Sequence, residues 1–155
     1  MNGSFRITVW DPPLIISQIL TMQCVMYISL GLWIVLLLHI LAGQPISIEY
    51  IFKYQEVNIK DISGLIVCYL LNSLICAASL WAIVQRTKLC LDFSATSHLI
   101  HFIACWMYNA TWPMSAAWWI LQISCITITC VLGEFLCLRS EMKAIPLGMP
   151  PKVDL

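Results

Sequence analysis

Charged residues are scarce in this sequence. Only 10% of its 155 residues are Asp, Glu, Lys or Arg, whereas 61% are hydrophobic and the mean hydropathy is +0.87. A soluble domain carries about 25% charged residues, so the composition excludes a water-facing globular surface. The eight basic residues balance the eight acidic ones, which leaves no basic excess to attract nucleic acid. The composition is that of a membrane protein, and we expect no nucleic-acid partner.

Motifs that carry familiar chemistry are also missing. The sequence contains no glycine-rich phosphate loop, no nucleophile elbow and no H-E-x-x-H zinc motif. Its eight cysteines form no C-x-x-C pair, which removes the simplest case for a membrane thiol oxidoreductase. We therefore expect no enzymatic activity and no cofactor.

Four apolar runs make up most of the chain, and each is long enough for the roughly 20 residues that a helix needs to cross a membrane. They cover about 14–42, 62–84, 92–112 and 114–138. Pro12 or Pro13 favours a helix start, and Gly43 with Pro45 favours its end. No small-residue cleavage pattern follows the first run, which argues against a cleaved signal peptide. The sequence predicts an all-α membrane protein, a single domain over 1–155 with four transmembrane helices.

The basic residues indicate the orientation. In a four-span chain the tails 1–13 and 139–155 share a side with the turn 85–91, and the loop 43–61 lies opposite. The first side has six of the eight cations, and the second has only Lys53 and Lys60. By the positive-inside rule both termini and the turn are cytoplasmic and the loop is lumenal. The loop mixes charges with aromatic residues, which is typical of a segment on the membrane surface.

Two cysteines lie near the cytoplasmic ends of the third and fourth spans. Cys90 and Cys137 are candidates for S-acylation, which occurs on juxtamembrane cysteines. The alternative is ordinary packing, since a free cysteine behaves as a small hydrophobic residue. Neither predicted lumenal segment contains a cysteine, so no extracellular disulfide framework is expected.

A polar cluster is predicted inside the membrane. His98 and His101 are three residues apart and share a helical face, and counting from the span ends places Glu134 at the depth of His98. Ionisable groups in a bilayer normally face the bundle interior, so we predict a contact between Glu134 and His98. It is a packing clamp, a proton relay or a zinc shell; we favour packing and assign no metal. An alternative function is a small proton-coupled transporter that uses Asp92, His98, His101 and Glu134.

Several blocks of the sequence resemble a known family in order and spacing. They include Phe5-Arg6, Val9-Trp10-Asp11-Pro12, Ser17-Gln18-Ile19, Ser29-Leu30-Gly31-Leu32-Trp33, Cys90-Leu91-Asp92-Phe93, Cys105-Trp106, Trp118-Trp119, Gly133-Glu134 and Ile145-Pro146-Leu147. By these residues the chain resembles the SYS family of Golgi integral membrane proteins over nearly its whole length. The segment 44–61 matches poorly, so nothing is carried over for it.

The resemblance implies a non-enzymatic, four-span protein of the Golgi membrane, mainly of the trans-Golgi network. Such a protein recruits an ARF-related small GTPase, recognised by its acetylated N-terminus, and supports protein targeting to the Golgi and vesicle traffic from endosomes. The cytoplasmic residues that would contact the GTPase are Phe5, Arg6, Trp10, Asp11, Arg86, Lys88, Asp92, Arg139 and Glu141. The acetylated terminus would enter the mouth of the bundle, where Asp92 or Glu134 would accept a hydrogen bond.

Overall fold

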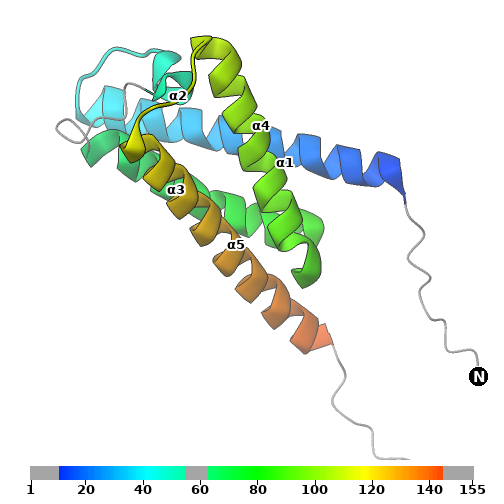
Figure 1. The fold of residues 1–155 in the computed structure, drawn as a ribbon. Helices are drawn as coiled ribbons and strands as arrows, with labels where there is room; N and C mark the ends of the chain where they lie inside the picture. Colours follow the sequence, from blue (N-terminus) through cyan, green and yellow to red (C-terminus); the bar gives the residue numbers. More distant parts are fainter. Residues whose placement is uncertain (1–10, 55–62, 145–155) are drawn as a thin grey trace, which may run out of the picture.

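The computed structural model describes residues 11–54 and 63–144, and within these ranges the chain forms helices and no strand (Figure 1). The all-α prediction is therefore confirmed. The elements are α1 (Pro12–Trp33), continued by a π-helical stretch (Ile34–Leu41), α2 (Glu49–Phe52), α3 (Ser63–Ser79), continued by a second π-helical stretch (Leu80–Val84), a 3₁₀ turn (Thr87–Leu89), α4 (Cys90–Asn109) and α5 (Ala116–Ala144).

The helix ends follow from local chemistry only in part. The first helix begins at Pro12 and stops before Gly43, whose φ of 66° is accessible to glycine, as predicted. The second and third long helices instead end at Gln85 and Ala110, which adopt φ values of 55° and 52°. Non-glycine residues seldom enter this left-handed region. No glycine therefore marks these two ends in the sequence.

Hydrogen bonds join different parts of the chain at each end of the bundle. At one end the Gln18 amide donates to the Ile83 carbonyl oxygen at 3.0 Å, which joins the start of α1 to the end of the second long helix. At the other end the Tyr54 hydroxyl donates to the Thr111 carbonyl oxygen at 2.9 Å. Figure 1 shows the starts of α1 and α4 and the end of α5 on the side away from α2. We call these two ends the charged end and the α2 end.

Two apolar clusters hold the bundle together. The cluster toward the α2 end includes Leu30, Ile34, Leu65, Cys105 and Trp118. The cluster at the charged end, which we call the apolar plug, consists of Met22, Leu80, Val84, Cys90, Phe93 and Cys137, each at most 5% exposed. α3 is central, because it packs against both α1 and α5. Burial on both sides of α3 therefore determines how the other helices are placed.

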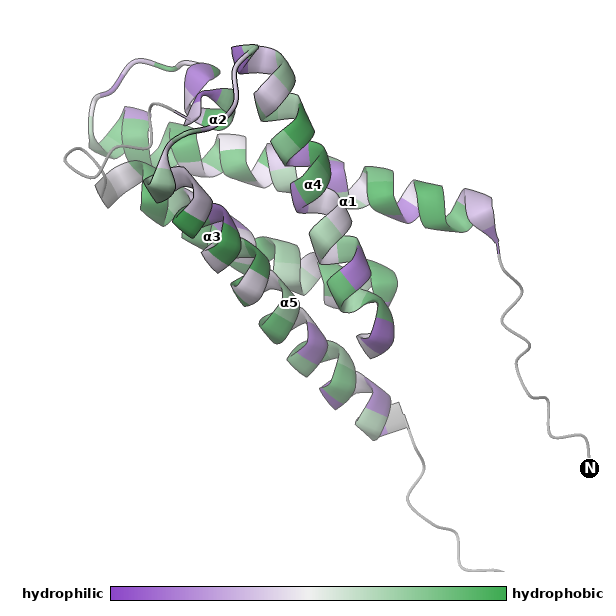
Figure 2. Cartoon of the chain, viewed as in Figure 1, coloured by the Kyte–Doolittle hydropathy of each residue, from purple (hydrophilic) through white to green (hydrophobic). Residues whose placement is uncertain are grey.

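The helices are apolar over most of their length (Figure 2), and many of their large hydrophobic side chains are exposed. Large side chains such as Ile28, at 73% exposed, and Leu41, at 72%, have no protein neighbours to cover them. An exposed apolar surface this extensive indicates contact with a membrane or with another protein. Figure 2 shows hydrophilic positions gathered around α2 and toward the end of α5, which matches a bundle whose middle lies in a membrane.

Three helices in the described ranges are long and apolar enough to cross a membrane: Pro12–Leu41, Gly64–Val84 and Ala116–Lys143. α4 has the length, with 20 residues, but Asp92 and several Ser, Thr and His residues make it less apolar. Its polar side chains are mostly turned inward, as the buried Ser94, Ser97, His98 and His101 show. Four spans and the orientation of the termini stay predictions.

The structure adds detail to two predicted segments. α5 continues through Ala144, so Arg139 and Glu141 of the predicted tail 139–155 lie in its last turns. Within the predicted surface loop, the described residues fold back on the bundle: the Tyr69 hydroxyl donates to the Ile51 carbonyl oxygen at 2.8 Å, and Tyr54 is buried. α2 therefore covers this end of the bundle. Phe5, Arg6 and Trp10 lie outside the described residues.

Candidate functional site

The turn between the second and third long helices is fastened to α5. The backbone N–H of Thr87 donates to Oε1 of Glu141 at 3.1 Å, and the Thr87 hydroxyl donates to Oε2 at 2.9 Å. These two bonds, with a smaller contribution from the charge of Lys88, hold the pKa of Glu141 below its usual value of 4.5. α5 has 29 residues, more than the roughly 20 that a helix needs to cross a membrane, and Glu141 is exposed near its end. The contact therefore holds the turn against α5 at the charged end.

Most predicted partner-binding residues that the structure describes are exposed at the charged end. Arg86, Lys88, Asp92 and Arg139 are exposed, and none of them forms an ion pair within residues 11–54 and 63–144. Asp92 lies in the first turn of α4, where a carboxylate is stabilised by the helix dipole. Asp11 is also exposed, immediately before α1. These charges are free to meet a partner in the aqueous phase.

The apolar plug closes the bundle directly beneath these charges. Leu80, Cys90 and Cys137 are fully buried, and Phe93 and Val84 are nearly so. Interiors packed at this density have no room for an added helix without displacement of side chains. The expectation that an acetylated terminus enters the mouth of the bundle does not fit this packing. A partner would therefore have to bind the outer surface of the charged end.

Cys90 and Cys137 contact each other inside the plug. Their Sγ atoms are 3.6 Å apart, both cysteines are free, and both side chains are 0% exposed. An acyltransferase needs an accessible thiolate, and neither sulfur offers one in this conformation. Their burial favours the alternative of ordinary packing between α4 and α5, and S-acylation of either cysteine stays a prediction.

The same pair of cysteines sets the register of α4 against α5, and it separates Glu134 from His98. Along the helix axes Glu134 is about 4–5 Å from the level of the pair and His98 about 12 Å, at 1.5 Å per residue. Glu134 accepts a bond from the Cys130 thiol at 3.6 Å. His98 instead contacts the carbonyl oxygen of Ser94. The predicted contact between Glu134 and His98 is wrong, and Glu134 does not belong to the histidine cluster.

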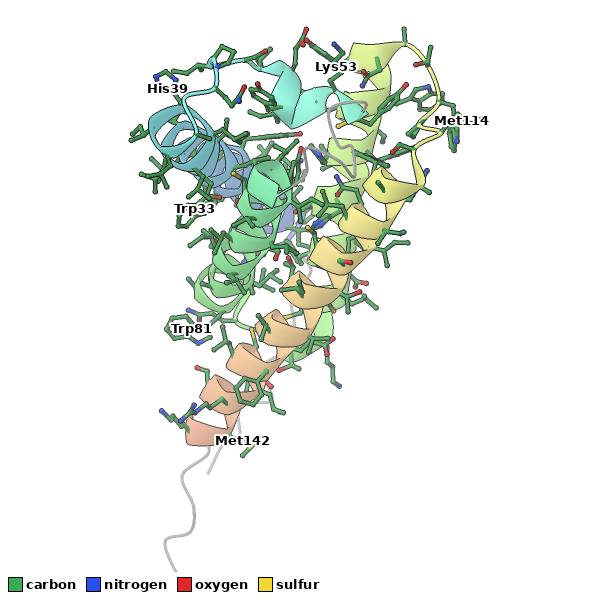
Figure 3. All side chains as sticks on the ribbon, turned by 90° about the vertical axis from the view of Figure 1, so that its left-hand side faces the viewer. Trp33, His39, Lys53, Trp81, Met114 and Met142 are labelled. Carbon is green, nitrogen blue, oxygen red and sulfur yellow. The ribbon has the colours of Figure 1, made fainter. Side chains whose placement is uncertain are left out.

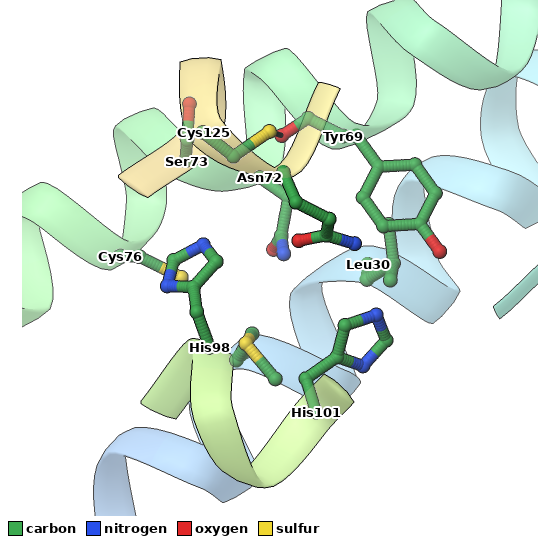
Figure 4. A pocket seen from close by; sticks show the side chains of 10 residues that line it. Leu30, Tyr69, Asn72, Ser73, Cys76, His98, His101 and Cys125 are labelled. Atoms are coloured by element: carbon green, nitrogen blue, oxygen red, sulfur yellow. Dashed lines mark hydrogen bonds between the residues drawn. The ribbon is translucent and has the colours of Figure 1, made fainter. Parts of the chain in front are cut away.

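The two histidines face the interior, and Figure 4 shows both rings pointing from α4 toward Asn72 of α3. His98 Nδ1 is 3.0 Å from the carbonyl oxygen of Ser94. This contact assigns the Nδ1 proton, because a carbonyl oxygen only accepts. His98 is 9% exposed and His101 2%. The inward orientation predicted for both histidines is confirmed.

His101 is enclosed by aromatic rings. Its centroid lies 5.8 Å from that of Tyr27, 6.3 Å from Phe52 and 6.3 Å from Tyr69. Its Nδ1 is 3.4 Å from the Tyr27 hydroxyl, and its Nε2 is 3.5 Å from Sγ of Cys105. Four elements, α1, α2, α3 and α4, thus meet around one imidazole. This geometry is that of a packing centre.

The cavity beside the histidines is small. Side chains from α1, α3, α4 and α5 line it, including Met26, Asn72, Cys76 and Gln122. It offers about 10 Å³ to the centre of a water molecule, which is about the room for one water. No group of three or more His, Cys, Asp or Glu in the described part of the chain is placed to hold a metal. The arrangement does not favour the proton-coupled carrier or a zinc shell.

Uncharged polar residues prove more important to the interior than the sequence indicates. The Gln23 amide donates to the Ser97 carbonyl oxygen at 3.3 Å, and the Ser29 hydroxyl bonds with Asn72. Gln122 is buried, and its Nε2 has no partner among the described residues. Polar residues in transmembrane runs commonly join helices. Their presence within apolar runs was the signal that could have identified Asn72 and Gln122.

Comparisons with known proteins match this chain to one family over most of its length. Residues 5–147 match the family model SYS1, described as "Integral membrane protein S linking to the trans Golgi network". A "Protein SYS1 homolog" from Nematostella vectensis is 46% identical over 150 residues, which cover 96% of this chain and 94% of the relative. One from Dictyostelium discoideum is 41% identical over 152 residues, covering 97% and 65%. "Protein SYS1" of Saccharomyces cerevisiae is 36% identical over 106 residues, covering 66% and 52%. No solved structure matches.

Proposed function

Because the chain belongs to the SYS1 family of integral membrane proteins, we propose that it recruits an ARF-related small GTPase to the Golgi membrane. The GTPase is recognised through its acetylated N-terminus. Recruitment supports protein targeting to the Golgi and traffic from endosomes to the trans-Golgi network. The observation that carries the proposal is the family match over residues 5–147, whose description names a link to the trans Golgi network.

The shape of the charged end suits a docking surface. Its described parts are a short turn, two helix starts and the end of α5, with no separate domain in which catalysis could take place. Arg86, Lys88, Asp92 and Arg139 are exposed and lack ion pairs within the described ranges. Free charges of both signs give a surface that can select a partner by electrostatic complementarity.

Two of the candidate residues have different roles in this proposal. Asp92 is exposed at the start of α4 and contacts the partner directly. Glu141 is occupied by Thr87, so it acts as a positioning residue that holds the turn carrying Arg86 and Lys88. The acetylated terminus is apolar and uncharged. It binds on the outer face of the charged end, because the apolar plug fills the space between the helices.

Reconstitution tests this proposal. The full-length protein in liposomes is mixed with an ARF-related GTPase that carries either an acetylated or a free N-terminus, and bound GTPase is measured by flotation. We expect binding only with the acetylated form. Asp92→Ala and the double variant Arg86→Ala, Lys88→Ala should each weaken it.

The matched control removes charges from the α2 end. The double variant Glu49→Gln, Lys53→Gln loses the one ion pair recorded in the described residues, at 3.2 Å, and should bind the GTPase as the unaltered protein does. Equal binding of the acetylated and free forms, or full binding by both variants at the charged end, would refute the proposal.

A further inference from the structure

A pocket of about 250 Å³ lies where the second long helix ends beside the last turns of α5. It is lined by Trp81, Leu136, Arg139, Ser140 and Lys143. Figure 3 shows Trp81 on the side of the bundle near the end of α5, far from Lys53 and Met114 at the α2 end. The pocket therefore joins the apolar flank of the bundle to its charged end.

The two cations of this pocket share one face of α5. Arg139 and Lys143 are four residues apart, which places them about 40° apart around the helix, with Leu136 and Ser140 on the same side. Like charges at this spacing repel each other. Glu141 stands two positions from each, about 160° around the helix from both, and its carboxylate is held by Thr87. The helix itself thus supplies no anion to the pair.

The polar groups of the pocket have no partners in the described part of the chain. No ion pair joins Arg139 or Lys143 to a carboxylate, and no hydrogen bond occupies the Trp81 indole N–H or the Ser140 hydroxyl. Ser124 and Thr127, in the middle of the same helix, instead donate to the carbonyl four residues earlier. Ser140 is left free, so the pocket presents hydrogen-bond donors and two positive charges.

A ligand for this pocket must combine a compact anion with an apolar body. Arg and Lys both bind phosphate, Arg through its planar fork and Lys as a point charge. A phosphomonoester carries about −1.5 to −2 charges at pH 7, which balances the two cations. Trp81 and Leu136 lie on the membrane side of the cations and suit acyl chains, and tryptophan is favoured at headgroup depth.

We propose that Arg139, Ser140, Lys143 and Trp81 form a binding site for a phospholipid whose headgroup ends in a phosphomonoester, such as phosphatidate. The lipid bridges the second long helix and α5 at the charged end. This inference does not depend on recruitment of a GTPase, because it concerns only the lipid that surrounds the protein. Basic pockets beside transmembrane helices are known to hold such headgroups.

The test uses the full-length protein in nanodiscs of phosphatidylcholine containing increasing phosphatidate, with bound lipid counted by native mass spectrometry. We expect phosphatidate to be retained in preference to phosphatidylcholine and phosphatidylserine. The double variant Arg139→Gln, Lys143→Gln should weaken retention about 30-fold, since each cation near an anionic lipid contributes about 1 kcal/mol. Lys143→Gln alone, at the exposed end of α5, should give a smaller loss in the same direction.

The matched control is Arg86→Gln, Lys88→Gln, which removes the same charge from the same end outside the pocket. It should retain phosphatidate as the unaltered protein does. An equal loss in the control would overturn the proposal in favour of general surface attraction. Displacement of the lipid by millimolar glycerol 3-phosphate would also overturn it, since the site would then be one for a free phosphate.

Discussion

The Thr87 backbone N–H and hydroxyl both donate to the Glu141 carboxylate, at 3.1 and 2.9 Å. One side chain of α5 thereby holds the turn that leads into α4. The residues that flank Thr87, Arg86 and Lys88, are the exposed cations of the proposed docking surface. Anything that releases Glu141 should leave the helices intact and loosen only the surface at the charged end.

The first prediction concerns pH. The pKa of Glu141 is lowered by the bonds from Thr87 and by Lys88, so the folded state favours the ionised carboxylate. Its stabilising contribution is fully present above the unfolded value of 4.5 and is lost as the pH falls through the lower folded pKa. The difference in melting temperature between the unaltered protein and Glu141→Gln should therefore be constant near neutral pH and should shrink below pH 4.5.

Thermal unfolding in detergent at several pH values measures this difference. Thr87→Val serves as the control, because it removes the hydroxyl donor but keeps the backbone N–H. It should reproduce part of the effect of Glu141→Gln at neutral pH. A difference that grows on acidification would contradict the assignment.

The second prediction concerns the contact of Gly133 with Leu80. A Cβ atom at Gly133 would lie 2.7 Å from Cδ1 and 3.3 Å from Cβ of Leu80, and Leu80 is completely buried. Gly133→Ala should therefore destabilise the protein by about 1–3 kcal/mol through overpacking. Gly31→Ala is the control, since nothing lies within 4 Å of its Cβ position. It should be neutral or slightly stabilising because alanine favours a helix. Equal destabilisation by both variants would contradict the contact between the second long helix and α5.

The third prediction uses the proximity of Cys90 and Cys137. Their sulfurs, 3.6 Å apart, need to approach by only about 1.5 Å to reach disulfide distance. With the other six cysteines replaced by serine or alanine, oxidation should join α4 to α5. Cleavage at a protease site inserted near Met114 then leaves the two halves linked until a reductant is added. The control variant carries Glu134→Cys in place of Cys137 as the partner of Cys90, and its disulfide should form more slowly. Faster formation in the control would contradict the register of α4 against α5.

The sequence predicts some features of the fold better than others. Apolar runs and the prolines and glycine around the first helix predicted the long helices within a few residues, because hydrophobic length and backbone restriction act locally. α5 continues through Ala144, beyond the apolar run 114–138, because the length of such a run predicts a span and not the end of the helix. Its last turns are joined to Thr87, a residue distant in the chain, and no pattern within the apolar run predicts that bond.

The depth of Glu134 also depends on contacts between residues that are distant in the chain. The count from the span ends placed Glu134 beside His98 because it took Asp92 and Arg139 to lie at the same depth. The true register is set by packing in the plug, where Cys90 meets Cys137. Side-chain volumes on two separate helices decide such a contact, and no pattern within one run reveals them. Sequence identified the inward-facing histidines but not their neighbours.

The fourth prediction concerns Asn109, which closes the α2 end. Its amide donates to the Phe52 carbonyl oxygen at 2.8 Å and to the Cys105 carbonyl oxygen at 2.7 Å. Asn109→Ala should cost about 1–3 kcal/mol, since two carbonyls lose their donor. Asn109→Asp should cost as much, because an ionised carboxylate cannot donate. Met107→Ala, at a position 78% exposed, is the control and should leave the melting temperature nearly unchanged. Tolerance of Asn109→Asp would show that the amide is not needed.

The fifth prediction separates packing from proton transfer at His101. If the ring serves the aromatic contacts with Tyr27, Phe52 and Tyr69, its size matters more than its titration. His101→Ala should then destabilise the protein by about 3–5 kcal/mol, as removal of a buried aromatic ring does. His101→Phe keeps the ring, loses the bond to the Tyr27 hydroxyl, and should cost about 1 kcal/mol.

Reconstituted liposomes with a pH gradient complete the comparison at His101. A packing centre beside a cavity with room for about one water should give no pH-dependent flux in the unaltered protein, and His101→Phe should bind the GTPase normally. A carrier would behave in the opposite way, since phenylalanine cannot take up a proton however well it packs. Flux that is present in the unaltered protein and abolished by a folded His101→Phe variant would therefore restore the transporter and reject the packing role.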